Sequence, residues 1–170
     1  LNSWYGGAST NFAGNFNGNG YTIYGIYRNE TNALKGFNTN YKYGAGLFCS
    51  VAEGNTLNVT NLNVDCCYVY AECNASVLVG YALNGATLNF DKVSVGENIF
   101  IKGGQTGIFH AYAMKSNTVN ININNSYSLA ELDCGFIGYP SRTSTSIKNS
   151  FSVNGTMVAG AVNSAVTLEN

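Results

Sequence analysis

Short apolar blocks alternate with polar stretches along the chain, and this pattern repeats. A four-residue apolar block recurs about every 25 to 31 residues, as Gly46-Leu47-Phe48-Cys49, Val77-Leu78-Val79-Gly80, Gly107-Ile108-Phe109-His110, Gly135-Phe136-Ile137-Gly138 and Gly160-Ala161-Val162-Asn163. Each is followed by a second block in which apolar and polar residues alternate, at 56–64, 87–95, 118–126 and 146–153, and a fifth begins at 166. A period of two is typical of a strand with one buried face. The pattern predicts an all-β chain built from internal repeats.

The length of the repeat decides how such units can pack. A unit this short cannot bury its own apolar face, whereas stacked units cover one another. Equivalent strands would then pair in parallel, about 4.8 Å apart. A propeller blade needs about 40 residues and four antiparallel strands, which is more than these units offer. We therefore expect a single β-solenoid domain of about five coils over residues 1–170. Residues 1–44 would form the entry and first coil, and residues 45–170 the repeats.

A turn is predicted at one position of each coil. The pattern apolar-x-Asn recurs and ends at Asn61, Asn125 and Asn149, and Gly25 follows Ile23-Tyr24 in the same way. Asn and Gly tolerate a left-handed backbone better than other residues. These four residues are expected to form a structural turn ladder whose Asn side chains hydrogen-bond along the stack. Lys92 occupies the same place in the second full coil, where we expect the ladder to break, so that this coil either turns differently or projects a charge there.

The repeated blocks resemble a known family. Gly-Leu-Phe-Cys, Val-Leu-Val-Gly, Gly-Ile-Phe-His and Gly-Phe-Ile-Gly, followed by Ile-x-Asn-Ser-Phe or Val-x-Asn-Leu, are similar to the GLUG-motif repeats of surface proteins. Residues 12–26 resemble the segment that introduces the first coil of such solenoids. The resemblance implies a right-handed parallel β-helix of pectate-lyase-like architecture in a large extracellular or cell-surface protein. Cys49 and His110 stand where the family pattern usually has Gly, and such departures fit a eukaryotic secreted protein better than a bacterial adhesin.

Composition narrows the classes of function. Only 10% of the residues are charged, and the net charge is −1, so no basic surface for nucleic acid or an anionic membrane is expected. No apolar stretch is long enough for a membrane-spanning helix, so membrane insertion is not expected. The chain opens with Leu and lacks a signal peptide, which we interpret as a mature product or a segment of a longer protein.

Cysteines and glycosylation sequons leave several possibilities open. The five cysteines either form at most two disulfides or serve as small buried hydrophobic residues: Cys49, Cys66, Cys67, Cys73 and Cys134. Their spacing does not match a zinc site, and with one His in the chain no metal or cofactor is expected. Five sequons permit N-glycosylation, at Asn29, Asn58, Asn74, Asn124 and Asn154.

Candidate catalytic residues are few. Glu131 and Asp133 lie two apart, but they precede a turn and are better explained as a solvated corner. His110, the only His, aligns with Cys49, Gly80 and Gly138 of the other blocks. Cys49 would then lie about 10 Å away, two strand spacings, which is too far for a thiolate–imidazole pair. Paired tyrosines such as Tyr41, Tyr43, Tyr68 and Tyr70 could stack on sugars, although packing explains them better.

The expected role is therefore structural and not enzymatic. A bare end of a solenoid exposes unpaired backbone and an apolar cross-section, which must be covered by more chain, another subunit or a partner. This favours a module of an extracellular filament, surface coat or adhesin, whose partners are other copies, further domains or glycans. The alternative is a carbohydrate-binding or polysaccharide-cleaving β-helix protein. Ice binding is a weaker option.

Overall fold

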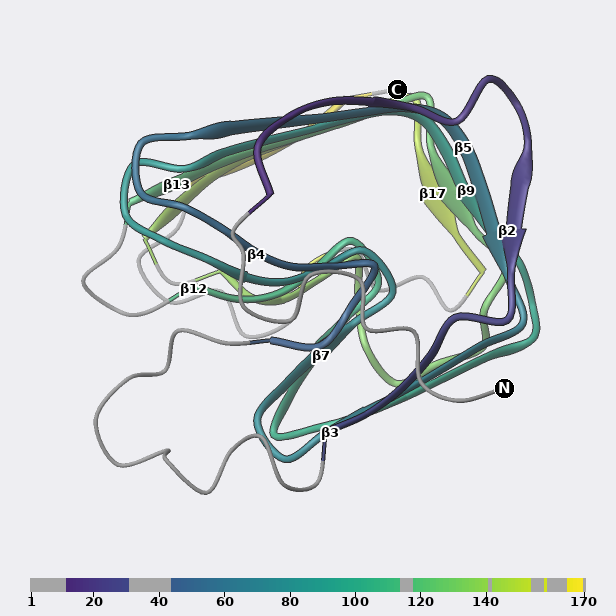
Figure 1. The fold of residues 1–170 in the computed structure, drawn as a ribbon. Coiled ribbons are helices and arrows are strands. Elements are labelled where there is room, and N and C mark those ends of the chain that lie inside the picture. The colour runs from purple at the N-terminus through teal and green to yellow at the C-terminus, as the bar shows by residue number, and fades with distance from the viewer. Residues whose placement is uncertain are drawn as a thin grey trace.

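The computed structural model describes residues 12–30, 44–113, 118–140, 142–153, 158 and 165–169. Within these ranges there is no helix, and every strand pair is parallel. Equivalent strands of successive repeats lie one behind another, so Figure 1 looks along the stack. The predicted all-β class with parallel sheets is confirmed, and it is consistent with a β-solenoid.

Four sheets enclose the interior. Sheet A is the longest and contains β1 (Gly14–Asn17), β2 (Thr22–Tyr24), β5 (Thr56–Asp65), β9 (Thr87–Val95), β13 (Val119–Asn124), β14 (Tyr127–Ser128), β16 (Thr143–Lys148), β17 (Phe151–Ser152) and β18 (Ala165–Glu169). Sheet B contains β3 (Tyr27–Glu30), β6 (Cys67–Ala71) and β10 (Ile99–Lys102). Sheet C pairs β7 (Asn74–Ser76) with β11 (Gln105–Gly107). Sheet D contains β4 (Phe48–Val51), β8 (Val79–Ala82), β12 (His110–Ala113) and β15 (Ile137–Tyr139).

The register of sheet A aligns the apolar positions of successive units. One interior column runs through Gly14, Leu57, Leu88, Ile121, Thr145 and Val166, and the next through Phe16, Val59, Phe90, Ile123, Ile147 and Leu168. In the middle units, Leu57, Leu88 and Ile121 are fully buried. Burying a side chain of this size stabilises the fold by about 1.5–3 kcal/mol. The alternation read from the sequence therefore becomes a stacked core.

Sheets A and D meet across this core through aromatic rings. Phe90 of sheet A packs edge-on against Phe109, which directly precedes β12 of sheet D, with ring centroids 5.2 Å apart, and Phe109 packs on Phe136, which directly precedes β15, at 4.7 Å. All three side chains are fully buried. The rings bind two sheets and consecutive units together.

The number of residues in one unit decreases towards the later units. Hydrogen-bonded side-chain partners in neighbouring units are 43, 31 and 33 residues apart in the first layers, and 24 apart between Asn125 and Asn149. Among the described residues, sheet B ends at β10 and sheet C at β11, while sheet A continues to β18. The last described layer is therefore formed mainly by sheet A.

Candidate functional site

A column of left-handed residues runs through the turn of sheet A. Asn61, Lys92, Asn125 and Asn149 occupy the same position in successive units, with φ of 50°, 55°, 50° and 48°. Asn149 Nδ2 donates to Asn125 Oδ1 at 3.2 Å, and Asn125 Nδ2 donates to Asp91 Oδ1 at 2.7 Å. Lys92 keeps the left-handed bend of the column and projects an exposed charged side chain, which was one of the two expected outcomes, and the run of Asn side chains is interrupted there as expected. Its neighbour Asp91 supplies the acceptor that an Asn at position 92 would otherwise provide.

Gly25 does not belong to this column, contrary to the expectation. Tyr24 pairs with Asp65, so Gly25 lies beside Cys66 in the following turn, where both residues are left-handed, with φ of 75° and 55°. At the position of the Asn column the first unit instead carries a longer segment, and Gly25 comes after it. Asn17 pairs with Thr60 but Thr22 pairs with Asn63, so residues 18–21 replace residues 61–62. Ile23 is consequently the counterpart of Val64.

A second, longer Asn ladder was not predicted. Asn58 Nδ2 donates to Asn15 Oδ1 at 2.7 Å, Asn89 Nδ2 to Asn58 Oδ1 at 2.7 Å, and Asn122 Nδ2 to Asn89 Oδ1 at 2.8 Å. These residues lie on the outer face of sheet A. The signal was present in the sequence, because an Asn follows the first apolar residue of the alternating blocks at 57 and 88. The ladder ties four units together outside the core.

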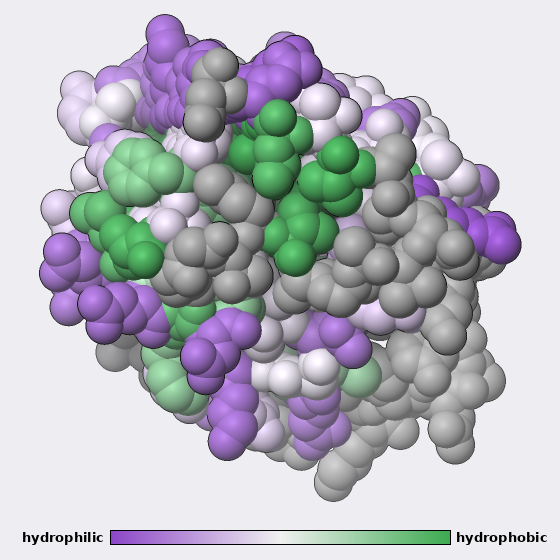
Figure 2. All heavy atoms as spheres, turned by 180° about the vertical axis from the view of Figure 1, so that it is seen from behind, coloured by the Kyte–Doolittle hydropathy of each residue, from purple (hydrophilic) through white to green (hydrophobic). Residues whose placement is uncertain are grey.

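The last layer of the stack leaves interior positions uncovered. Val166 and Leu168 of β18 continue the two core columns of sheet A, yet they are 37% and 60% exposed. Figure 2 looks at the stack from the opposite end to Figure 1, and hydrophobic side chains gather in the middle of this face with hydrophilic ones around them. β18 is also the edge strand of sheet A within the described residues. This end combines an unpaired backbone edge with apolar side chains.

Exposed aromatic rings form a column on the outer face of sheet B. Tyr27 stacks on Tyr68 with ring centroids 5.2 Å apart, and Tyr68 on Phe100 at 4.7 Å, with interplanar angles of 17° and 7°. Stacked rings cover one another's faces, so the column presents mainly ring edges and hydroxyls outward. Of the tyrosine pairs noted in the sequence, Tyr68 joins this column and Tyr70 lies beside Asn29 and Lys102, while positions 41 and 43 are outside the described residues.

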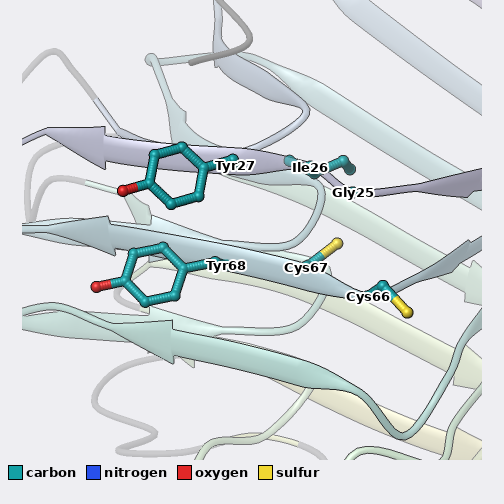
Figure 3. A pocket seen from close by; sticks show the side chains of 6 residues that line it. All are labelled: Gly25, Ile26, Tyr27, Cys66, Cys67 and Tyr68. Atoms are coloured by element: carbon teal, nitrogen blue, oxygen red, sulfur yellow. The ribbon is translucent and has the colours of Figure 1, made fainter. Parts of the chain in front are cut away.

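A shallow hollow adjoins this column. It has a volume of about 420 Å³ and lies between two neighbouring strands, where Gly25, Ile26 and Tyr27 stand beside Cys66, Cys67 and Tyr68 (Figure 3). Figure 3 shows the rings of Tyr27 and Tyr68 one beside the other, and the two sulfur atoms directed differently. The lining is apolar, apart from the tyrosine hydroxyls and the thiols. It offers packing surface without a charged side chain.

A second hollow brings together two acids that the sequence did not associate. Glu97 and Glu131 line it with Leu129 and Val153, and its volume is about 400 Å³. Both carboxylates are exposed. Glu131 was expected to act with Asp133, if at all, but its partner across this hollow comes from the preceding unit. Two carboxylates in one hollow are the minimum for a glycosidase.

His110 is buried and has a different alignment from the expected one. It pairs with Val79 on one side and with Ile137 on the other, so it is one residue away from the Gly80 and Gly138 positions. Its Nδ1 lies 3.3 Å from the carbonyl oxygen of Val79, and its Nε2 has no hydrogen-bond partner. Complete burial lowers the pKa of the imidazole to about 4, so the ring is neutral at physiological pH.

The cysteines are all free thiols, so none of the possible disulfides is formed in this structure. Burial raises the pKa of Cys67 to about 12 and that of Cys134 to about 11. Burial also raises the pKa of Cys73. Cys49 is buried and accepts a hydrogen bond from the guanidinium of Arg28 at 3.0 Å. Thiols with raised pKa values are poor nucleophiles, and only Cys66 is exposed.

The sequons differ in accessibility. Asn29 is exposed, whereas Asn58 and Asn124 are half-buried, and the Asn58 side chain is engaged in the Asn ladder. Asn74 is only 2% exposed, so a glycan on it is incompatible with this packing. Asn154 lies outside the described residues. Asn29 is the sequon best placed for modification.

The comparisons with known proteins identify no relative. No family model, no curated protein and no solved structure matches the chain. In the part of the chain that the structure describes, no helix is long and apolar enough to cross a membrane, and no three His, Cys, Asp or Glu side chains gather into a metal-binding group.

Proposed function

We propose that the chain is a structural module that works by assembly, through the open last layer of its β-solenoid. The observation that carries this proposal is the exposure of Val166 and Leu168, which continue columns that are buried in earlier units. An unpaired strand edge is a template for pairing with another chain. Apolar side chains beside that edge add a hydrophobic driving force for the same contact.

We further propose that the stack is a right-handed parallel β-helix of about five coils in an extracellular filament, surface coat or adhesin. The resemblance of the repeated blocks to GLUG motifs supports this proposal. Low charge supports close packing, since few ions must be desolvated at a contact. The exposed sequon at Asn29 is compatible with an extracellular glycoprotein. Partners would be other copies or further domains of the same protein.

Sedimentation of the purified chain tests the proposal. We expect the average mass to rise above 18.1 kDa as concentration increases, and the Leu168→Lys variant to stay at the monomer mass. Val153→Lys is the matched control, because it places the same charge on an aliphatic side chain that is 49% exposed elsewhere. A wild-type chain that remains monomeric throughout, or equal effects of both variants, would contradict the proposal. Circular dichroism checks that both variants fold.

A second candidate is supported by the Glu97 and Glu131 hollow. Two carboxylates could act as acid and base on a glycosidic bond that lies between them. Release of reducing sugar from a panel of polysaccharides, compared between wild type and Glu131→Gln, tests this alternative. Hydrolysis that the variant loses would favour the enzyme.

A further inference from the structure

The two edges of sheet A have complementary side-chain patterns. Among the described residues β1 is the first strand of this sheet and β18 the last, and all intervening pairs are parallel. In β1 the inward residues are Gly14 and Phe16, and the outward ones are Asn15 and Asn17. In β18 Val166 and Leu168 continue the inward columns, while Thr167 and Glu169 continue the outward ones. A second copy placed after β18 would therefore continue both alternations without a break.

The inward columns also fit in size. In the described part of the chain Gly14 begins the column that Val166 ends, and no described atom lies within 4 Å of the place where a Cβ of Gly14 would be. The exposed Val166 of one copy would face this open space in the next copy. Leu168 would meet Phe16, which is only partly covered in its own chain. Val166 would fill the space that Gly14 leaves, and Leu168 would pack against the ring of Phe16, so apolar atoms would meet in both columns.

Charge does not oppose this contact. Glu169 is paired with Lys148 of its own chain at 2.9 Å, and the position that it would face, Asn17, is neutral. Thr167 would stand beside Asn15, which begins the Asn ladder. A hydroxyl there can act as donor or acceptor towards an amide. The joint would bring together no like charges in sheet A.

We propose that copies of this chain join head to tail, with β18 of one copy pairing in parallel with β1 of the next, so that Thr167 faces Asn15. The inference rests on the proposed assembly function and specifies its partner and register. A head-to-tail contact uses different surfaces on the two copies, so it propagates into rings or filaments and does not stop at a dimer.

Disulfide trapping tests this register. Neighbouring Cα atoms of paired parallel strands lie about 4.8 Å apart, within the range that a disulfide spans. One copy carries Thr167→Cys and the other Asn15→Cys, both in a Cys66→Gly background that removes the exposed thiol. Gly suits the left-handed backbone at position 66. We expect a mixed disulfide dimer after mild oxidation, and its loss when Leu168→Lys is added to the first copy.

Asn58→Cys is the matched control for Asn15→Cys, because it occupies the same outward column one layer deeper. It should give no mixed dimer. A disulfide that forms only between two Thr167→Cys copies would indicate a tail-to-tail contact. That result would overturn the head-to-tail register and leave the assembly proposal in place. Association without any of these cross-links would overturn this register alone. A mass of 18.1 kDa at every concentration would overturn both proposals.

Discussion

The first and last described layers of the stack differ in which side chains cover the apolar core. At the first layer, Phe12 stacks on Phe48 with ring centroids 5.0 Å apart, and Phe16 packs edge-on against Phe48 at 5.5 Å. The backbone N–H of Phe12 donates to the carbonyl of Ser50 at 3.1 Å, which links the start of sheet A to sheet D. At the last layer, Val166 and Leu168 occupy equivalent columns and remain exposed.

The difference shows what is needed to close a solenoid interior. The first layer has aromatic rings from two facing sheets, and these rings meet across the end of the core. At the last layer sheet A reaches β18, while the described strands of sheet D end at β15. Beyond β15, the described continuation of sheet D is the single residue Val158, which bridges to Ile137 and packs against the core. The described part of sheet D therefore covers less of the inner face of sheet A in this layer than in earlier ones. Aromatic rings therefore cover part of the first layer, although Phe12 is itself 38% exposed and Phe16 is only partly buried, so both end layers keep apolar surface for contact with another molecule.

The largest expected effect comes from removing the ring that closes the first layer. Phe48→Ala should lower the free energy of unfolding by about 3–5 kcal/mol, because it empties the centre of the aromatic group. Leu168→Ala at the open layer should cost less than about 1 kcal/mol in a dilute, monomeric sample, since that side chain is largely exposed. Urea denaturation of both variants measures the contrast. Similar losses would mean that the two layers are equally closed.

The buried imidazole of His110 should make the free energy of unfolding depend on pH. The native pKa of His110, about 4, lies below the usual value of 6.5, so the native state binds fewer protons than the unfolded chain between these values. The stabilisation is complete above pH 6.5 and falls by about 3 kcal/mol as the pH drops to 4. His110→Gln should lack this component of the pH dependence. The difference between the urea unfolding curves of the two proteins gives the measurement, and superimposable profiles would refute the assignment.

The Asn ladder offers a smaller contrast between the middle and the edge of sheet A. Asn89 both donates to Asn58 and accepts from Asn122, so Asn89→Ala should cost about 1–2 kcal/mol. Asn15 makes one side-chain bond within the ladder, and Asn15→Ala should cost about half as much. Thermal unfolding of both variants tests the ranking. A larger loss at Asn15 would mean that the edge contributes more than the middle.

The smallest expected effect is a gain in stability. Lys92 adopts a left-handed backbone that Asn tolerates better, and its counterparts in the flanking units are Asn61 and Asn125. Lys92→Asn should raise the free energy of unfolding by up to about 1 kcal/mol. Urea denaturation measures the gain, and Lys92→Ala, which lacks the tolerance of Asn, should show none.

Sequence reasoning succeeded where a residue's role depends on local periodicity. Alternation at 56–64 and 87–95 led to parallel stacked strands, and apolar-x-Asn located three left-handed turn residues at 61, 125 and 149. It failed where the pairing register between adjacent units determines which residues lie next to each other. Residues 18–21, not Gly25, stand opposite the turn that contains Asn61, so Gly25 lies in the following turn, and His110 is displaced by one position.

The candidate surfaces were harder to foresee for the same reason. The hollow of Glu97 and Glu131 joins residues of different units, and the aromatic column joins Tyr27, Tyr68 and Phe100 from three units. Such contacts depend on the length of each intervening loop, which a repeat pattern leaves variable. The exposed end was expected in general terms, but its residues depended on knowing which strand is last in sheet A.

The long Asn ladder aligns the dipoles of its side-chain amides along the stack. Each Nδ2 donates towards the preceding unit and each Oδ1 accepts from the following one, so the amide dipoles from Asn15 to Asn122 are aligned. Hydrogen bonds in such a chain polarise one another, and every added member strengthens those before it. Reversing a single amide would oppose its neighbours on both sides. The ladder thus favours one orientation for any amide that extends it.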